Sequence, residues 1–488
     1  MRVLFVMRNH GYLRHYASTI RMLAERGHQV IVGSRGPERH QPVDSQSFLL
    51  GMCEEFPGIS SERIPVRADE WIPLAAEIRA ARNVMRYRHP VFRQSHKLLE
   101  RAENHAAKHA PHLAGWLPKN GIAASAASGV LAAMENAIPP ASKLDAWLRK
   151  LKPNAMVVTP LVDFNSSQTD YVKSGKARGI PVALAVASWD NLTNKGVMVV
   201  KPDRVLVWNQ PQVDEAVRLH GMGPENVKIT GAPLYDDWFS ARPSTTYDDF
   251  CRRIGLDPAV PYVLYLCSSS FIAPDEIAYV HRWITALRES GRPELRDCGV
   301  LVRPYPGMAA SWQDADFSSY RNVSVWPRQG AFPLFTDVKQ EYFESLHHSV
   351  AVAGINTSGM IEAGIVGRRS FTILEPEFAE TQEGAVHFHH LTRQGFLAVA
   401  TSMDQHHAQL AEELRQPSNR DSFAPFLQSF VRPDGLDVPA TPRLVQEIEA
   451  LADLHPAPTR PGRLSRLATR VARAALVPHA QPHRQPSQ

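Results

Sequence analysis

The stretch RVLFVMRNHGYLRHYASTIRMLAERGHQVIVGS, from Arg2 to Ser34, decides the fold of the chain. It predicts a strand, a loop, an amphipathic helix and a second strand, and we expect the helix to end at Gly27 in a left-handed cap. Two apolar strands joined by one helix form a right-handed βαβ unit whose strands pair in parallel. The chain therefore begins as part of a parallel α/β sheet.

Apolar runs further along the chain continue this alternation of strand and helix. A first series lies at 155–160, 181–187, 203–208 and 226–231, and a second at 262–267, 299–304, 323–326, 349–354 and 370–373. The composition changes between the two series, near residues 241–248. This alternation is typical of an open α/β sheet. We expect an α/β protein with two domains, at residues 1–240 and 255–450.

Length and charge fit this organisation. A chain of 488 residues is too long for one typical core. Hydrophobic residues make up 44% of the chain and charged residues 21%, which is ordinary for a soluble globular protein. The net charge of +5 fits an enzyme that handles anionic substrates or lies near anionic lipid, and it does not indicate a nucleic-acid partner.

Cysteine spacing and the N-terminus indicate a cytoplasmic protein. The four cysteines form no Cys-x-x-Cys pair, which favours reduced thiols. The first apolar run stops at Arg8 and is too short for a secretory signal. No stretch reaches the roughly 20 apolar residues of a membrane span. The Ala-rich residues 121–134 therefore predict a packed helix.

Two basic segments fall outside the alternation. Residues 72–150 predict a helical insertion with many basic side chains, namely Arg79, Arg82, Arg86, Arg88, Arg93, Lys97 and Arg101. The tail at 455–488 follows the last acidic residue, Asp453. In a helix, four of its arginines share one face: Arg463, Arg466, Arg470 and Arg473. Its apolar residues share another: Leu464, Leu467, Val471 and Ala474. Such a helix lies on anionic membrane, so we expect contact with the inner membrane face; a solvated, poorly ordered tail is the alternative.

The stretch AGINTSGMIEAGIVGRRSFTI, from Ala353 to Ile373, predicts a strand, a polar turn, a short helix and another strand. The turn contains Asn356, Thr357, Ser358 and Gly359. Free N–H groups at a helix start favour an anion such as a diphosphate, and a glycine lets the backbone approach the ligand. One turn later, Glu362 is placed to accept hydrogen bonds from ribose hydroxyls. A capped helix with a solvent-facing glutamate is the alternative.

Four stretches together resemble the GT-B glycosyltransferases: the opening unit and residues 203–239, 300–307 and 354–373. The resemblance covers residues 1–70 and 150–450. It implies two Rossmann-like, doubly wound domains that face each other across a cleft, with a nucleotide-sugar on the second and the acceptor on the first. It also implies that Ser358 and Gly359 hold the diphosphate and that Glu362 holds the ribose.

Further donor-binding side chains are expected near this helix. Arg303 ends a predicted strand and is placed to face the donor phosphates, with a surface ion pair as the alternative. Glu383 and His387, with His390, follow the last predicted strand of the second domain and are expected to close over the sugar. These histidines have no evident carboxylate partner, so we expect no metal. We expect no cofactor either, the nucleotide-sugar being a substrate.

The loop after the first strand predicts part of the acceptor site. Three of its residues are expected to bind the acceptor: Asn9, Gly11 and Arg14. Two histidines, His10 and His15, are candidates to take the proton from an acceptor hydroxyl, because imidazole titrates near neutral pH. A loop histidine more often has a structural role, and that alternative stays open.

Two aspartates follow later strands of the first domain. Asp163 comes after the run at 155–160, and Asp190 with Asn191 after the run at 181–187. We expect Asn191 to bind the acceptor and either carboxylate to serve as the catalytic base, with Asp190 ranked above Asp163. An Asp-Asn turn that bonds its own backbone is the alternative.

The expected function is a glycosyltransferase that moves a sugar from a nucleotide-sugar to a saccharide or lipid-linked acceptor in surface polysaccharide or glycoconjugate synthesis. Three alternatives remain. One is a sugar-nucleotide 2-epimerase, although the His-Pro and Asp-rich loop of those enzymes are not found. Another is a polyol-phosphate transferase, against which Tyr305 counts, because relatives with such donors often have Arg-x-His-Pro where this chain has Arg303-Pro304-Tyr305-Pro306. The third is a scaffold that binds nucleotide or polysaccharide without turnover.

Overall fold

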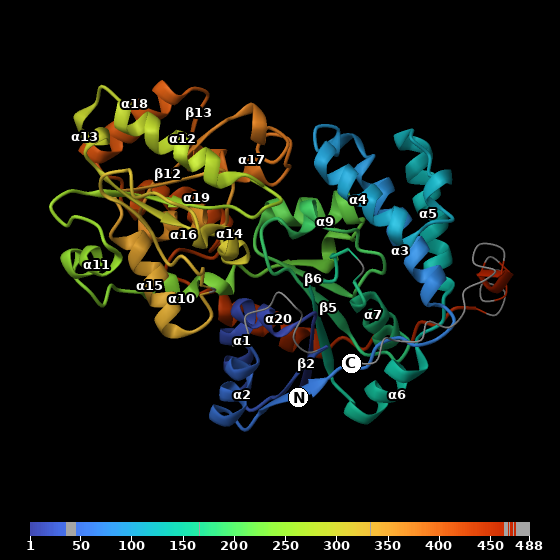
Figure 1. The fold of residues 1–488 in the computed structure, drawn as a ribbon. Helices are drawn as coiled ribbons and strands as arrows, with labels where there is room; N and C mark the ends of the chain where they lie inside the picture. Colours follow the sequence, from blue (N-terminus) through green and yellow to red (C-terminus); the bar gives the residue numbers. More distant parts are fainter. Residues whose placement is uncertain are drawn as a thin grey trace. The chain divides into compact units, whose positions relative to one another are not determined.

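The chain folds into two compact α/β units (Figure 1). The computed structural model describes residues 1–35, 45–164, 166–331, 333–462, 467, 469–471 and 473–474. One unit is formed by Met1–Pro233 with Pro439–Gln488, and the other by Leu234–Val438. Each contains one parallel sheet, so the predicted α/β class with two doubly wound domains is confirmed.

The first unit has a seven-stranded parallel sheet in the order β3-β2-β1-β4-β5-β6-β7. Its strands are β1 (Arg2–Met7), β2 (Gln29–Ser34), β3 (Ile59–Arg63), β4 (Ala155–Thr159), β5 (Val182–Ala185), β6 (Arg204–Val207) and β7 (Val227–Ile229). Val3 on β1 pairs with Val30 on β2 and with Ala155 on β4. Leu4 and its neighbour Phe5 belong to separate hydrophobic clusters, because successive side chains point to opposite faces of the sheet. Both faces are therefore buried, as parallel sheets require.

Helices cover this sheet (Figure 1). They are α1 (Leu13–Glu25), α2 (Ser45–Glu55), α6 (Ser142–Leu151), α7 (Gln168–Lys176), α8 (Asn191–Asn194), α9 (Gln210–His220) and α20 (Ala440–Ala452). Gly27 follows α1 with φ +81°, as the predicted left-handed cap requires. The helix α20 packs on α1, where Glu449 contacts Arg26 at 2.8 Å and His28 at 2.9 Å. The expected boundary at residue 450 thus differs from the structure, in which the chain returns to the first unit at Pro439.

The insertion forms three helices, α3 (Ile72–Tyr87), α4 (His96–His109) and α5 (Gly121–Ala137). The insertion is helical, as expected, but several of its arginines are turned toward the protein. Arg79, Arg82 and Arg86 on α3 are all nearly buried. Arg79 contacts Glu135 of α5 at 2.9 Å and Asp170 of α7 at 2.8 Å. These arginines join the insertion to the sheet instead of facing a partner.

The second unit has a six-stranded parallel sheet in the order β10-β9-β8-β11-β12-β13. Its strands are β8 (Tyr262–Leu266), β9 (Gly299–Arg303), β10 (Val323–Val325), β11 (Ala351–Gly354), β12 (Ser370–Ile373) and β13 (Leu397–Ala400). Its helices are α10 (Asp236–Ser240), α11 (Tyr247–Ile254), α12 (Glu276–Glu289), α13 (Pro293–Arg296), α14 (Ala309–Gln313), α15 (Thr336–His347), α16 (Gly359–Val366), α17 (Phe388–Leu391), α18 (Met403–Arg415) and α19 (Ala424–Phe430). Counted along the chain within this unit, the strand order is again 3-2-1-4-5-6.

Two strands were missed at the sequence level, β3 and β13. Both lie at the edge of a sheet, where one side of the strand has no neighbour. The sequence of β3, ISSER, has only one apolar residue, and its middle residues are exposed. In the part of the chain that is described, no single helix is long and apolar enough to cross a bilayer. The pair α5 and α6, bent by 62°, passes on length and composition only.

Candidate functional site

Most of the predicted site residues follow the carboxyl ends of strands near the point where the strand order reverses. In the first unit the reversal falls between β1 and β4, and in the second between β8 and β11. Ligands of open α/β sheets bind in the crevice at such a point, because the connecting loops diverge there. Each unit therefore offers one candidate site.

The turn before α16 forms as predicted, with Ser358 exposed at the helix start and Thr357 half-buried. The Asn356 side chain points into the protein, where its amide donates to the Thr381 carbonyl at 2.6 Å and lies 3.4 Å from His387 Nε2. Gly359 has a packing role, and its expected role beside the diphosphate stays a prediction. A Cβ atom there would lie 2.5 Å from Leu266 Cδ1 and 2.8 Å from the Tyr342 hydroxyl. The glycine allows close packing under the helix start.

Glu362, the predicted ribose ligand, accepts a short hydrogen bond from the Tyr342 hydroxyl. Tyr342 lies on α15, and burial together with the adjacent Glu362 raises its pKa well above the ordinary value. The phenol therefore remains a donor at neutral pH, which fixes one oxygen of the carboxylate. This contact could not be predicted from local pattern, because the two residues are twenty positions apart in the chain.

Arg303, at the end of β9, is only 6% exposed. Its Nη1 lies 3.4 Å from Ser345 Oγ and 3.6 Å from Glu341 Oε1, and its guanidinium stacks over the Tyr342 ring at 4.8 Å. Its buried Nη2 atom has no hydrogen-bond partner among the described residues. Burial lowers the pKa of this guanidinium, and an anion would restore the lost solvation. Arg303 is thus a buried cation with a donor left over.

After β8, sequence reasoning missed two residues: Ser268 in the loop and Glu276 at the start of α12. Ser268 lies against the backbone of Asn356, with its hydroxyl 3.4 Å from the Asn356 carbonyl. The Ser268 N–H donates to Glu276 Oε2 at 2.7 Å, and the Tyr265 hydroxyl donates to Oε1 at 3.3 Å. Burial raises the pKa of Glu276 to about 8. The triple serine at 268–270, directly after an apolar strand, was the available signal.

The residues predicted to close over the sugar, Glu383, His387 and His390, differ in their burial and contacts. His387 is buried beside Asn356, and His390 is also buried. The Glu383 side chain is exposed, and its carbonyl lies 2.8 Å from His389 Nε2. His387 therefore lies next to the turn that begins α16.

In the first unit, the loop after β1 forms a short 3₁₀ turn, His10–Tyr12. Asn9 caps it by accepting from the Gly11 N–H at 3.1 Å. His10 is buried with Nε2 2.5 Å from Ser34 Oγ, and burial lowers its pKa. His15 lies inside the packing of α1, where burial and Arg14 lower its pKa well below the ordinary value.

The two predicted aspartates lie near the same loop. Asp163 pairs closely with Arg8, the residue that follows β1. Asp190 lies 3.3 Å from the side-chain amides of both Asn191 and Asn194, and its role as the base stays a prediction. Tyr12, not singled out from the sequence, has its pKa raised by burial and by the negative charges of Asp163 and Asp190. Tyr12, Asp163 and Asp190 are therefore close enough to interact electrostatically.

Metal ligands do not gather in either unit. Within the described residues, no group of three His, Cys, Asp or Glu side chains is arranged to hold an ion. Metal-independent chemistry stays a prediction.

The fold is shared with known sugar-nucleotide enzymes. No family model and no curated protein sequence matches the chain. The UDP-GlcNAc 2-epimerase of Neisseria meningitidis, solved with UDP-GlcNAc, superposes with a TM-score of 0.52 at 11% identity over 92% of this chain and 100% of its own. The Rickettsia bellii UDP-N-acetylglucosamine 2-epimerase scores 0.52 at 11% identity over 93% and 97%. WaaG, a glycosyltransferase of lipopolysaccharide biosynthesis, scores 0.48 at 13% identity over 91% and 99%. At these identities the likeness establishes fold alone: the chain has the GT-B type of fold, with two Rossmann-like domains.

Proposed function

We propose that this protein is a glycosyltransferase that moves a sugar from a nucleotide-sugar to a saccharide or lipid-linked acceptor in surface polysaccharide or glycoconjugate synthesis. One observation carries the proposal. Arg303 is a buried cation with an unfilled Nη2 donor. Its guanidinium lies over the ring of Tyr342, whose hydroxyl donates a hydrogen bond to Glu362. A diphosphate needs such a cation, and a ribose needs such a carboxylate.

The donor would be held by three parts of the second unit. Arg303 and the N–H groups at the start of α16 would bind the diphosphate, and Glu362 would accept from the ribose hydroxyls. In the reaction, the acceptor oxygen forms a bond to the anomeric carbon while the bond from that carbon to the diphosphate breaks. The nucleoside diphosphate leaves with the negative charge, which Arg303 and the helix N–H groups stabilise.

The acceptor proton would pass to a base on the first unit. Asp190 is the first choice; its carboxylate lies 3.3 Å from the amides of Asn191 and Asn194, whereas the Asp163 carboxylate pairs with Arg8. His10 is the next candidate, because burial keeps its imidazole neutral and able to accept a proton. His15 is given no such role, because it is packed inside α1 and its Nε2 contacts Arg14 at 3.0 Å. We propose that the reaction uses no metal.

The first test is thermal stabilisation by a panel of nucleoside diphosphates and monophosphates. A ligand that binds only the native state raises the melting temperature by mass action. We expect one nucleotide to stabilise the wild type and the matched surface variant Glu289→Gln, and to stabilise Glu362→Ala much less. If no nucleotide stabilises the wild type, the proposal is wrong.

Product analysis then separates the remaining alternatives. The nucleotide-sugar that carries the preferred base is incubated first without acceptor and then with saccharide and lipid-linked acceptors. Transfer that needs an acceptor supports the proposal. An isomerised nucleotide-sugar formed without acceptor indicates an epimerase, transfer of a polyol phosphate indicates the related transferase, and binding without any product indicates a scaffold.

A further inference from the structure

The most exposed large hydrophobic side chains come from two segments of the first unit. Five are at least 60% exposed: Trp116 at 86%, Ile122 at 84%, Val130 at 63%, Leu467 at 60% and Val471 at 65%. The first three belong to the insertion and the last two to the tail. A contiguous exposed apolar face in a folded protein marks a contact surface.

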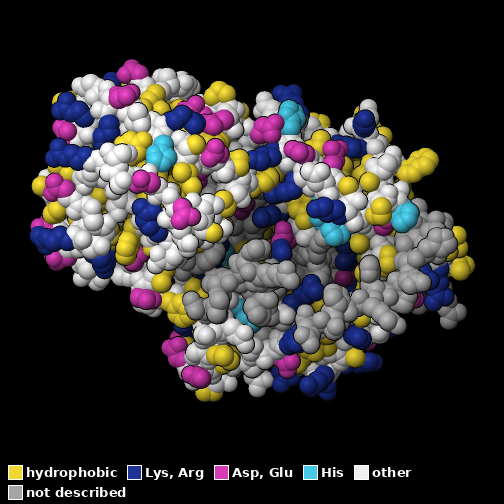
Figure 2. Space-filling model, viewed as in Figure 1, with side chains coloured by type: hydrophobic (Ala, Val, Ile, Leu, Met, Phe, Trp, Pro, Cys, Tyr) yellow, Lys and Arg dark blue, Asp and Glu magenta, His cyan; other side chains and the backbone are white. Residues whose placement is uncertain are grey.

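The helix α5 carries the longer of these apolar faces. Its inner side packs against α3 through Ala124, Leu131 and the ion-paired Glu135. Its outer side presents Ile122, Ala126 and Val130, which are four residues apart and therefore share one face. No charged residue occurs between Lys119 and Glu135. One side of the helix is thus fixed to the protein while the other is apolar and exposed, and Figure 2 shows hydrophobic side chains over the α4 and α5 region.

The charged side chains in the segment that carries this face are basic, and the acidic residue that precedes the segment, Glu103, pairs with Arg88 at 3.0 Å. The sequence contains no acidic residue from 104 to 134. Lys108 and His109 at the end of α4 are exposed, and so is Lys119 just before α5. Trp116 lies between these basic groups, in the 3₁₀ turn Ala114–Trp116. An apolar stripe edged by cations is complementary to a layer with an apolar interior and an anionic surface.

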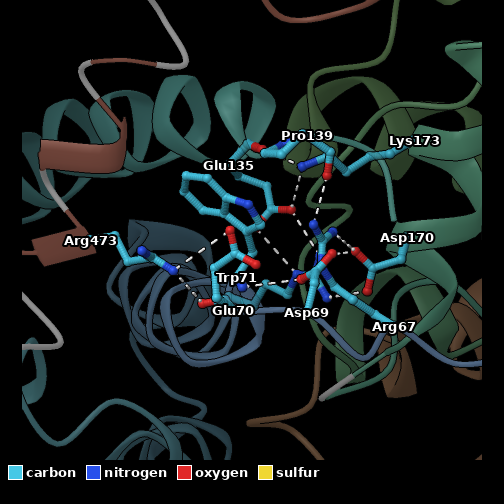
Figure 3. Close-up of polar contacts among 10 residues, drawn as sticks. Arg67, Asp69, Glu70, Trp71, Glu135, Pro139, Asp170, Lys173 and Arg473 are labelled. Carbon is cyan, nitrogen blue, oxygen red and sulfur yellow. Dashed lines mark hydrogen bonds and ion pairs between the residues drawn. The ribbon is translucent and has the colours of Figure 1, made fainter. Parts of the chain in front are cut away.

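The described part of the tail also exposes apolar side chains, beside one arginine that contacts the protein. Arg473 faces the protein, where it lies over the Trp71 ring at 5.2 Å and within 3.9 Å of Glu70 (Figure 3). Leu467 and Val471 are exposed instead. Arg463, Arg466 and Leu464, which the expectation also used, lie outside the described residues. Arg470, the other described arginine of the predicted face, is exposed, so that face is not turned to the protein as a whole.

We infer that the outer face of α5, with Trp116, binds the surface of an anionic lipid bilayer. The helix would lie in the plane of the interface with Ile122 and Val130 among the upper acyl chains. Trp116 would lie at the headgroup level, where tryptophan is enriched, and Lys108 and Lys119 would contact lipid phosphates. This inference does not depend on the nucleotide site.

Flotation of the full chain with vesicles tests the inference. We expect binding to vesicles of phosphatidylcholine mixed with phosphatidylglycerol, and little binding to phosphatidylcholine alone. The variant Trp116→Ser/Ile122→Ser/Val130→Ser should bind the mixed vesicles at least about tenfold more weakly, because it lacks the three apolar side chains that the bilayer would bury. Lys108→Glu/Lys119→Glu should weaken binding in a salt-dependent way.

Two controls keep the test decisive. Leu50→Ser removes a half-exposed apolar side chain from α2 and should leave flotation unchanged. Circular dichroism and the melting temperature of each variant report whether it folds. The inference is wrong if wild type does not float with the mixed vesicles, or if the triple variant is folded and floats as well as wild type. It is also wrong if the apolar face instead forms a dimer of the chain that the triple variant abolishes.

Discussion

Buried arginines occur in both units, but their surroundings differ. In the first unit, Arg67 and Arg79 share Asp170, and Arg67 also binds Asp69 and the Pro139 carbonyl, as Figure 3 shows for the labelled residues. In the second unit, Arg303 makes two long polar contacts, lies on one tyrosine ring and keeps a buried donor unfilled within the described structure. The first set is satisfied by the protein itself, and the second is not.

This difference shows that burial of a charge alone does not indicate function. The network around Asp170 and Glu135 ties α3, α5 and α7 together, and Lys173 adds a contact of 3.1 Å to Glu135. Its cost of desolvation is offset inside the fold. At Arg303 the protein offsets only part of the desolvation cost, and a bound anion would offset the rest. The unfilled donor on Nη2, and not burial alone, distinguishes Arg303 from Arg67 and Arg79.

The largest expected effect is the loss of stability when the ion-pair network around Asp170 and Glu135 is broken. Asp170→Asn would leave Arg67 and Arg79 without their shared carboxylate, and we expect a loss of about 3–5 kcal/mol in the free energy of unfolding, measured with urea. Asp145→Asn, which breaks a half-buried pair with Arg178 at 3.1 Å, is the matched control and should cost no more than about 1 kcal/mol. Equal losses in the two variants would contradict the comparison.

A second prediction contrasts Asp170 with Glu276, whose carboxyl has hydrogen bonds but no ion pair among the described residues. The arginines lower the pKa of Asp170 despite its burial, so its stabilising contribution is present above its unfolded pKa and lost as the pH falls. Burial raises the pKa of Glu276 from 4.5 to about 8, so its contribution is complete below pH 4.5 and is lost as the pH rises to about 8.

Stability measured from pH 4.5 to 8 tests this contrast. Relative to wild type, Glu276→Gln should become more stable as the pH rises, by about 1.4 kcal/mol per pH unit. A difference between wild type and variant that does not change with pH would show that Glu276 titrates normally in the folded protein.

The third prediction concerns Arg303. Because the protein leaves the Nη2 donor unfilled and makes only long contacts to Nη1, Arg303→Met should change the free energy of unfolding by no more than about 1 kcal/mol. The affinity for a nucleoside diphosphate should fall roughly ten- to a hundredfold, since a hydrogen bond to a charged group contributes about 1.5–3 kcal/mol. Calorimetric titration measures the affinity, and Arg282→Met, in an exposed pair with Glu377, is the control. Strong destabilisation with unchanged affinity would make Arg303 a structural residue.

The smallest expected effect is at Tyr342. Tyr342→Phe keeps the ring under Arg303 and removes the hydrogen bond to Glu362, so nucleotide affinity should fall about fivefold while inorganic diphosphate binds as before. Tyr247→Phe, which removes a hydroxyl bonded to the Val260 carbonyl, is the control. If both ligands weaken equally, the tyrosine does not act through the ribose carboxylate.

Much of the fold was predictable because it depends on local pattern. Strands buried on both faces need continuous apolar runs, which identified β1, β4 and β8. The edge strand β3 was missed because it does not need such a run. The helix α20 is amphipathic in sequence, but nothing local indicates that its apolar face packs in the first unit.

Sequence alone determined the class of fold, the left-handed cap at Gly27 and the carboxyl-end positions of Asp163, Arg303 and Glu362. These depend on periodicity and on which residues follow a strand. Only the tertiary structure decided that Arg79 is satisfied whereas Arg303 is not, and that Tyr342 holds Glu362. The reason is physical: whether a charge is paired depends on side chains that are distant in the chain, and no local pattern records which of them meet.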